Sequence, residues 1–337
     1  MYIPWGEWSL IKDRLPAKRW QLLGCISPEE RCRAASKNLK ADIDWSTLVK
    51  IWDESPLDSQ EERARLTRQE EFFFQDLTDP VVVEKPLLAS LDDLFDVVEG
   101  MAGKSENVLF DITSFPKRWF FGLLRFLLEE GRFKNVVVTY APAQSYDSVL
   151  ASNPETIRAL PGFSSLDTRD DCDVAFVGVG FHSHSIMDLF DLERPRRLSM
   201  FLPFPPGPPG LVRNWKFVER FETAIRAQED TSLEGTPISE LRISALDAPQ
   251  CFAALISGSD FGKRSSLVAP FGPKPMSLAM ALFCLWVERE GIGEVPAYYS
   301  QPLRYSLDYS KGISKYRGKD RLLSYPVKIN GKLLYRG

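Results

Sequence analysis

Residues 107–131, NVLFDITSFPKRWFFGLLRFLLEEG, and residues 265–291, SSLVAPFGPKPMSLAMALFCLWVEREG, decide the fold of this chain. Each stretch opens with an apolar run of strand length, passes through a short turn that ends in Pro-Lys, and continues as a long apolar helix. Strand, turn and helix in this order form the βα unit of a parallel sheet. Because the pattern occurs twice, we interpret the chain as an internal duplication. A chance match between two ordinary βα units is the alternative.

The sequence on both sides continues the alternation of strands and helices. Apolar runs predict strands at residues 19–26, 47–52, 81–84, 107–112, 135–140, 173–179, 197–202, 241–246, 266–269 and 295–299. Helical periodicity and start signals predict helices that begin at Ser27 and cover residues 59–77, 90–101, 116–130, 185–192, 212–228, 248–257 and 276–290. This order predicts an α/β fold of two tandem Rossmann-like halves with mainly parallel sheets, related by a pseudo-twofold axis.

The predicted boundaries follow from composition. We expect a first Rossmann-like half at residues 1–145, a loop-rich linker at 146–170, a second half at 171–305, and a basic tail with a hairpin at 306–337. The hairpin is predicted to turn at Asn330-Gly331. From residue 301 onward there are nine Lys/Arg and two Asp/Glu, a balance of +7 in a chain of net charge −4. Such a tail indicates an anionic partner, nucleic acid included, or pairing within the protein.

Several classes of protein are excluded by the sequence. No apolar run reaches the ~20 residues of a membrane span, and the mixed N-terminus is no signal peptide. The five cysteines are scattered without a Cys-x-x-Cys pair, which predicts buried free thiols in a cytoplasmic protein and no zinc site. Walker, G-x-G-x-x-G and G-x-S-x-G patterns are absent, so we expect no dinucleotide cofactor and no serine hydrolase.

The ends of the predicted strands supply the candidate ligand site. In an open parallel sheet, ligands bind outside the carboxyl ends of the strands, where the strand order switches. The candidate ligand-binding residues are therefore Ser27, Asp111, Thr113, Ser114, Lys117, His182, His184, Gly272, Lys274, Gln301 and Arg304.

The two lysine turns carry the most information. A helix N-terminus presents backbone N–H groups and a positive dipole end, both of which suit a phosphate. Hydroxyls at Thr113 and Ser114 add donors, Gly272 allows close approach to the backbone, and Lys117 and Lys274 add charge. The alternative is an ordinary helix start, in which the hydroxyl caps the helix and the lysine points to water.

Both histidines lie in Phe181-His182-Ser183-His184, directly after a predicted strand. They suit contact with a phosphate or acid–base catalysis, while a plain loop is the alternative. A third metal ligand at a matching spacing is missing, so no metal site is expected. Gln301 and Arg304 follow the last predicted strand and start the basic tail.

The duplicated pattern resembles the CARF superfamily and its fused relative SAVED. Asp111 to Lys117 is similar to the family turn D-[IL]-T-G-G-T-K, with Ser114-Phe115-Pro116 in place of Gly-Gly-Thr, and Gly272-Pro273-Lys274 is similar to its G-T-K. The resemblance implies a sensor that binds a nucleotide, in particular a cyclic oligonucleotide, in a prokaryotic antiviral defence system with an effector protein as partner. An enzyme acting on phosphodiesters through Lys117, Lys274 and His182 is the first alternative. A non-catalytic partner subunit is the second.

Overall fold

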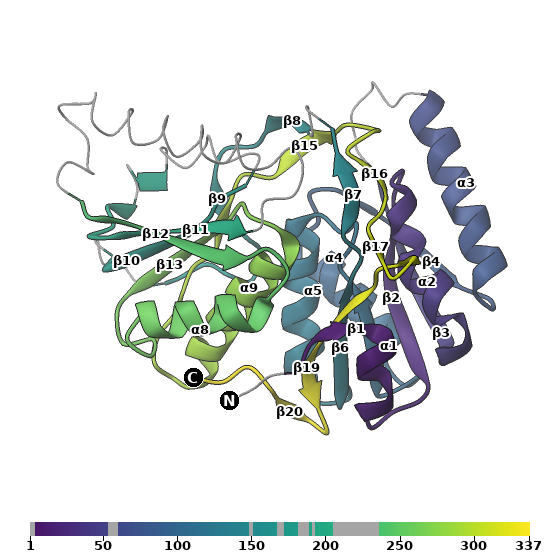
Figure 1. Cartoon of the computed structure of the whole chain (residues 1–337), viewed down its shortest axis with the longest axis horizontal. Coiled ribbons are helices and arrows are strands. Elements are labelled where there is room, and N and C mark those ends of the chain that lie inside the picture. The colour runs from purple at the N-terminus through teal and green to yellow at the C-terminus, as the bar shows by residue number, and fades with distance from the viewer. Residues whose placement is uncertain are drawn as a thin grey trace. The chain divides into compact units, whose positions relative to one another are not determined.

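The computed structural model describes residues 4–52, 60–147, 151–166, 172–180, 189–190, 193–204 and 236–337. The chain divides into two compact units. The first unit contains residues 1–153 and 302–334, and the second contains residues 154–301 and 335–337. Each unit is built on its own mainly parallel sheet, so the chain is a mixed α/β protein (Figure 1).

The strands of the first unit follow the predicted alternation. Those of its main sheet are β1 (Gly6–Glu7), β2 (Trp20–Ile26), β3 (Ile43–Trp52), β4 (Val81–Pro86), β5 (Asn107–Asp111), β6 (Asn135–Tyr140), β19 (Leu323–Ile329) and β20 (Lys332–Leu333). Their order is β1-β19-β6-β5-β2-β3-β4, with β20 paired to β19. The five strands from β6 to β4 are parallel, whereas β19 is antiparallel to β6. β2 is buried along its whole length because both faces of the sheet are covered.

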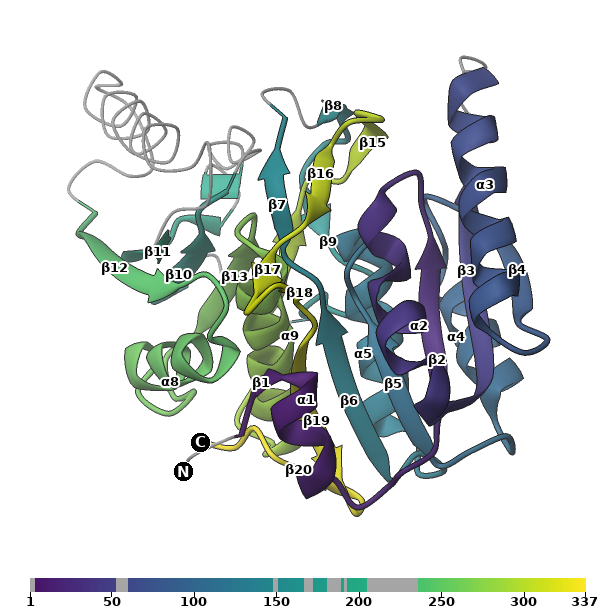
Figure 2. The same ribbon diagram turned by 45° about the vertical axis from the view of Figure 1, so that its right-hand side comes forward.

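Helices cover both faces of this sheet. They are α1 (Trp8–Ile11), α2 (Ala34–Leu39), α3 (Gln60–Asp76), α4 (Leu91–Met101) and α5 (Lys117–Glu129), with short 3₁₀ turns at Lys12–Arg14, Glu30–Arg33 and Lys40–Asp42. α1, α2 and α3 share one apolar cluster with the sheet, in which Trp20, Leu48 and Phe73 are buried. α4 and α5 lie on the opposite face (Figure 2). α4 begins with a capping box between Ser90 and Asp93.

Smaller strand pairs complete the first unit at the carboxyl end of its sheet. These strands are β7 (Ala143–Tyr146), β8 (Ala151–Pro154), β15 (Pro302–Tyr305), β16 (Ser310–Ile313), β17 (Lys315–Tyr316) and β18 (Lys319–Asp320). β16 pairs antiparallel with β7, β15 pairs with β8, and β17 pairs with β18. The chain between β15 and β18 therefore belongs to the first unit.

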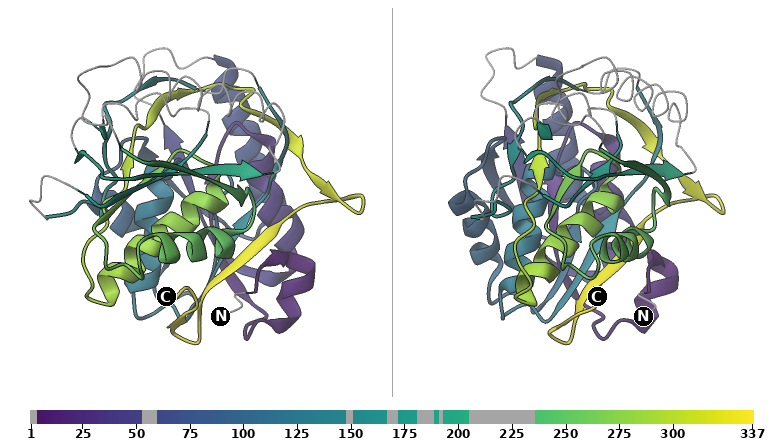
Figure 3. Two further views of the ribbon diagram at one scale, coloured as in Figure 1. Left: turned by 60° about the vertical axis from the view of Figure 1, so that its left-hand side comes forward. Right: turned by 90° about the vertical axis from the view of Figure 1, so that its left-hand side faces the viewer.

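The second unit has a four-stranded parallel sheet among its described residues. Its strands are β9 (Arg158–Ala159), β10 (Val174–Gly178), β11 (Leu198–Phe204), β12 (Ile238–Ser244), β13 (Ser266–Pro270) and β14 (Tyr298–Tyr299), and its helices are α8 (Ala248–Gly258) and α9 (Lys274–Arg289). The sheet order is β12-β11-β10-β13, and Ala297 forms an isolated parallel bridge to Val268 of β13. β14 pairs antiparallel with β9. α8 and α9 pack side by side on one face of the sheet (Figure 3).

The C-terminal segment differs from the predicted basic tail. β19 is buried next to β6, because this position removes the apolar side chains of Leu323, Tyr325 and Val327 from water. The predicted hairpin is present, and Asn330 and Gly331 have the positive φ values of 49° and 75° that its tight turn requires. The predicted linker at 146–170 is also not featureless, since β8 and β9 lie within it.

Three other predictions need correction or fall outside the structure. Ser27 does not cap a helix: the 3₁₀ turn begins at Glu30 and α2 begins only at Ala34, while Ser27 Oγ accepts from the Glu29 N–H at 3.2 Å. The strand predicted at 295–299 is reduced to Tyr298–Tyr299 and the bridge at Ala297. The predicted helix at 212–228 lies outside the described residues, and so does most of the one at 185–192.

Candidate functional site

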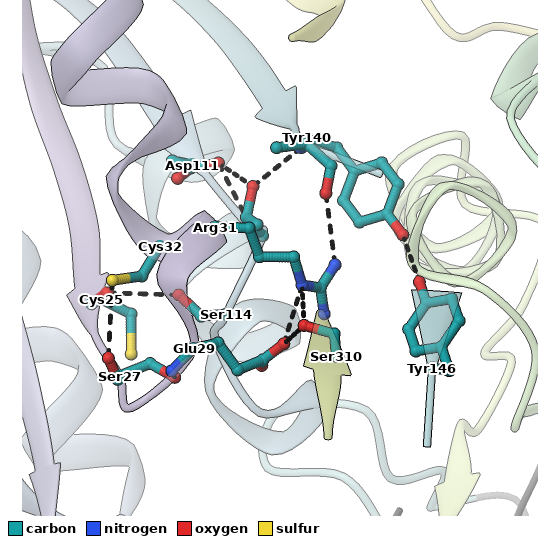
Figure 4. Close-up of polar contacts among 12 residues, drawn as sticks. Cys25, Ser27, Glu29, Arg31, Cys32, Asp111, Ser114, Tyr140, Tyr146 and Ser310 are labelled. Carbon is teal, nitrogen blue, oxygen red and sulfur yellow. Dashed lines mark hydrogen bonds and ion pairs between the residues drawn. The ribbon is translucent and has the colours of Figure 1, made fainter. Parts of the chain in front are cut away.

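The first unit has a topological switch point between β2 and β5. From β2 the chain moves to β3 and β4 on one side, and from β5 it moves to β6 on the other. Ligands of open α/β sheets bind at the carboxyl ends of the strands at such a point. Ser27 follows β2 and Ser114 follows β5, and the Ser114 hydroxyl donates to the Cys25 carbonyl at 3.2 Å (Figure 4). The structure thus brings together the candidate residues of the first half.

Asp111 is the centre of a buried hydrogen-bond network at the end of β5. Its Oδ1 accepts from the Thr113 hydroxyl at 2.5 Å, from the Thr139 hydroxyl at 3.2 Å and from the Thr113 N–H at 3.3 Å. The Thr113 hydroxyl in turn accepts from the Ala141 N–H at 2.9 Å. Asp111 is 2% exposed and Thr113 is fully buried. Ligand contact by these two side chains stays a prediction, and the visible role of both is to fix the turn that leads into α5.

The start of α5 differs from an ordinary capped helix. Its N-cap is Pro116, and neither Thr113 nor Ser114 caps it, because both hydroxyls are engaged elsewhere. Lys117 is the first helical residue and is buried, contrary to the expectation that a lysine here points to water. A positive side chain in the first helical turn opposes the helix dipole, so a nearby negative group would stabilise this arrangement.

The second unit repeats this helix start. α9 has Pro273 as N-cap, with φ −56° and ψ 152°, and the corresponding angles of Pro116 are −56° and 149°. Lys274 follows as the first helical residue, and no side chain caps the helix. The turn lies after β13, next to β10, at the switch point of this sheet. The two lysine turns therefore share backbone geometry as well as sequence.

Gly272 has a packing role in the structure, and its contact with a ligand stays a prediction. A Cβ at this position would lie 2.7 Å from the Met276 sulfur and 3.4 Å from the Val179 carbonyl oxygen. At Gly180, a Cβ would lie 1.9 Å from the Phe271 carbonyl oxygen. Glycine is therefore needed because the loops after β10 and β13 pack backbone to backbone. A side chain at Gly272 would therefore meet the protein itself.

The most unusual polar group of the first unit is Arg31, which the sequence analysis did not select. Its guanidinium is 3% exposed, at the carboxyl end of the sheet. Nε donates to Glu29 Oε2 at 2.8 Å and to Ser310 Oγ at 3.0 Å, and Nη1 donates to the Ala141 carbonyl at 3.2 Å. Ser310 also hydrogen-bonds Glu29 Oε2. Figure 4 shows this cluster, which joins the loop after β2 to the end of β6 and to β16.

Aromatic rings surround the guanidinium. The Arg31 Cζ lies 6.0 Å from the ring centroid of Tyr140 and 5.7 Å from that of Tyr146, whose hydroxyls are 3.3 Å apart. Burial opposes the charge of Arg31, but Glu29 and the phenol groups outweigh it and hold the pKa of the guanidinium above its ordinary value. Burial also raises the pKa of Tyr140. The cluster is thus an Arg31 guanidinium that is paired with Glu29 and flanked by two aromatic rings.

The remaining candidates lie elsewhere. His182 and His184 lie outside the described residues. Gln301 is fully buried in the second unit, where its backbone carbonyl accepts from the Glu155 N–H at 3.0 Å. Arg304 is exposed on β15. Within the described ranges, no group of His, Cys, Asp and Glu side chains is arranged to hold a metal ion.

Two further sequence predictions have visible outcomes. All five cysteines are free and buried, as predicted. No helix of the described segments is long and apolar enough to cross a membrane.

A signal for the Arg31 cluster was present in the sequence but was ambiguous. Ser27-Pro28-Glu29-Glu30 has the composition of a helix start, and early carboxylates are typical of such a start, so nothing in the pattern marks Glu29 and Arg31 as a buried pair. Ser310 lies 279 positions from Arg31. Only the pairing of β16 with β7 brings the two side chains together.

No protein-family model matches this sequence, and no curated protein matches it. Among solved structures, the chain is similar to leucoanthocyanidin reductase from Vitis vinifera, determined as a binary complex with NADPH. The match covers 82% of this chain and 92% of the reductase chain, with 9% sequence identity and a TM-score of 0.26. Since so distant a likeness carries no argument about ligand or activity, function is argued from the residues of this chain.

Proposed function

We propose that this protein binds a nucleotide at the carboxyl end of the sheet of its first unit. The observation that carries the proposal is the start of α5. A helix at the switch point begins with a buried lysine and has no side-chain cap, so its N-terminus is built for a negative group. The phosphate of a nucleotide is the group that such sites bind in open α/β sheets.

The second lysine turn gives the second unit a candidate phosphate site of the same kind. Lys274 stands at the start of α9 in the same backbone geometry as Lys117 at the start of α5. The shared strand order and helix start support descent of both units from one duplicated ancestor. The nucleotide is in particular a cyclic oligonucleotide, as in the sensor families that the sequence resembles. The protein would then be a sensor of a prokaryotic antiviral defence system that passes the signal to an effector protein.

Calorimetric titration of the full chain with linear and cyclic oligonucleotides tests this proposal. Lys117→Met and Lys274→Met keep most of each apolar stem and remove the charge, and each is expected to weaken binding roughly tenfold to a hundredfold. Lys134→Ala is the matched control, because this exposed lysine precedes β6 at the amino end of the same sheet. Equal affinity of wild type and both methionine variants for every nucleotide would refute the proposal. Recovery of intact ligand after titration distinguishes a sensor from a phosphodiester-cleaving enzyme.

A further inference from the structure

Arg31 uses only part of its hydrogen-bonding capacity. A guanidinium binds a carboxylate or phosphate side-on through Nε and Nη2, whose N–H bonds point in nearly the same direction. Here Nε is engaged by Glu29 and Ser310, while Nη1 donates to the Ala141 carbonyl. In the part of the chain that the structure describes, Nη2 has no hydrogen-bond partner. The side-on fork is therefore half occupied.

The open donor is unusual in a side chain that is only 3% exposed. Nη2 is not among the buried polar atoms that lack a hydrogen-bond partner, so this end of the guanidinium reaches solvent and is accessible to a ligand. Glu29 lies only two residues away, on the same short loop, and its Oε2 accepts from Arg31 Nε. Glu29 is itself 13% exposed, so its carboxylate lies closer to solvent than the guanidinium that it neutralises.

We propose that Arg31 is a phosphate-binding residue and that the ligand's phosphate displaces the Glu29 carboxylate from it. This inference rests on the proposed function, because the phosphate is one carried by the nucleotide. A phosphate has oxygens for both Nε and Nη2, so it completes the fork that Glu29 fills by half. The Ser310 hydroxyl, which now bonds Glu29, is placed to donate to the same phosphate. No bond is made or broken in this exchange of one anion for another.

The exchange connects ligand binding to one segment of the first unit. Arg31 is covered by β16, and that strand is held to β7 by the pairings Ser310↔Tyr146 and Lys311↔Ser145. Arg65 of α3 fixes the preceding turn by donating to the Leu307 carbonyl at 2.9 Å. A phosphate that takes the place of Glu29 therefore meets Ser310 on a strand that is held in position from both sides.

Two variants with opposite expected effects test the inference. Glu29→Gln removes the competing anion while keeping the shape of the side chain, so inorganic pyrophosphate and ADP should both bind roughly tenfold or more tighter than to wild type. Arg31→Met should abolish this gain when it is combined with Glu29→Gln. The probes are titrated calorimetrically into the full chain at constant ionic strength. Glu99→Gln, on α4, is the matched control, because Glu99 pairs with the exposed Arg132 and takes no part in the Arg31 cluster, and it should leave both affinities unchanged.

The outcomes separate this inference from the proposed function. If Glu29→Gln binds neither probe more tightly than wild type, Glu29 does not compete with a phosphate and the inference is wrong. That result leaves nucleotide binding at Lys117 intact when wild type still binds ADP. If Glu29→Gln gains affinity for pyrophosphate but not for ADP, Arg31 binds free phosphates rather than those of a nucleotide, and the inference fails in the form stated. Should Arg31→Met not fold, Ser310→Ala in the Glu29→Gln background gives the same test, with a loss of several-fold expected.

Discussion

Asp111→Ala is the substitution whose effect distinguishes a structural role from a ligand-binding one. It removes the acceptor of three donors, the hydroxyls of Thr113 and Thr139 and the Thr113 N–H. A buried donor without an acceptor costs about 1–3 kcal/mol. Because neighbouring losses do not add fully and some relaxation follows, we expect a decrease of about 3–5 kcal/mol in the free energy of unfolding. This is a large share of the ~5–15 kcal/mol that stabilises a typical domain.

The assay is urea denaturation followed by circular dichroism, together with ADP titration of the folded variant. Asp92→Ala is the control, because Asp92 is exposed in the first turn of α4 and its loss should cost under about 1 kcal/mol. A variant that unfolds like wild type but no longer binds nucleotide would contradict the argument. Asp111 would then act on the ligand, as the sequence alone suggested, and its hydrogen bonds to the two threonines would contribute little to stability.

Two further predictions concern stability. Hydrogen bonds from Lys85 and from Ser90 lower the pKa of Asp93 to about 2, so its contribution to stability is present above about pH 4 and is lost as the pH falls toward 2. After allowance for solvent screening, Asp93→Asn should remove about 1 kcal/mol of this acid-dependent stability. The measurement is the free energy of unfolding at pH 2, 3, 4 and 7. If the stability of the variant changes with pH in the same way as that of wild type, the assignment to Asp93 is wrong. Gly180→Ala should destabilise the protein by about 2–3 kcal/mol in urea denaturation, because the new methyl group meets the Phe271 carbonyl. Gly293→Ala is the control and should be nearly neutral, because the space around Gly293 is open.

The sequence predicts the sheets better than it predicts the site. Strands such as β2, β5 and β6 are short apolar runs bounded by polar turns, and their hydrophobic pattern alone determines where they begin and end. β19 was missed as a sheet strand because pairing with β6 depends on a contact between distant parts of the chain. The apolar residues at every second position, Leu323, Tyr325, Val327 and Ile329, look the same in a free hairpin and in a sheet.

The candidate site shows the same limit in its side chains. The strand-end rule led to Ser27, Asp111 and Ser114, and the structure brings all three to one switch point. It did not distinguish a side chain that faces a ligand from one that fixes a turn. Asp111 and Thr113 have the residue types of a phosphate-binding loop, yet their polar atoms serve each other and Thr139. Arg31 was missed because burial of this charged residue depends on Ser310 of β16, which lies 279 positions later in the chain.

The two polar networks at this switch point differ in how many hydrogen bonds must break when a ligand binds. The Asp111 network is fully buried and joins β5, β6 and the start of α5, so disturbing it costs several hydrogen bonds at once. The Arg31 network has one anion that is partly exposed and one donor, Nη2, that remains open. A ligand that replaces Glu29 therefore meets a guanidinium whose surroundings stay in place while only the Glu29 side chain moves. Donors that the fold already holds in place favour phosphate binding, because no free energy is then spent on ordering these side chains when the ligand binds.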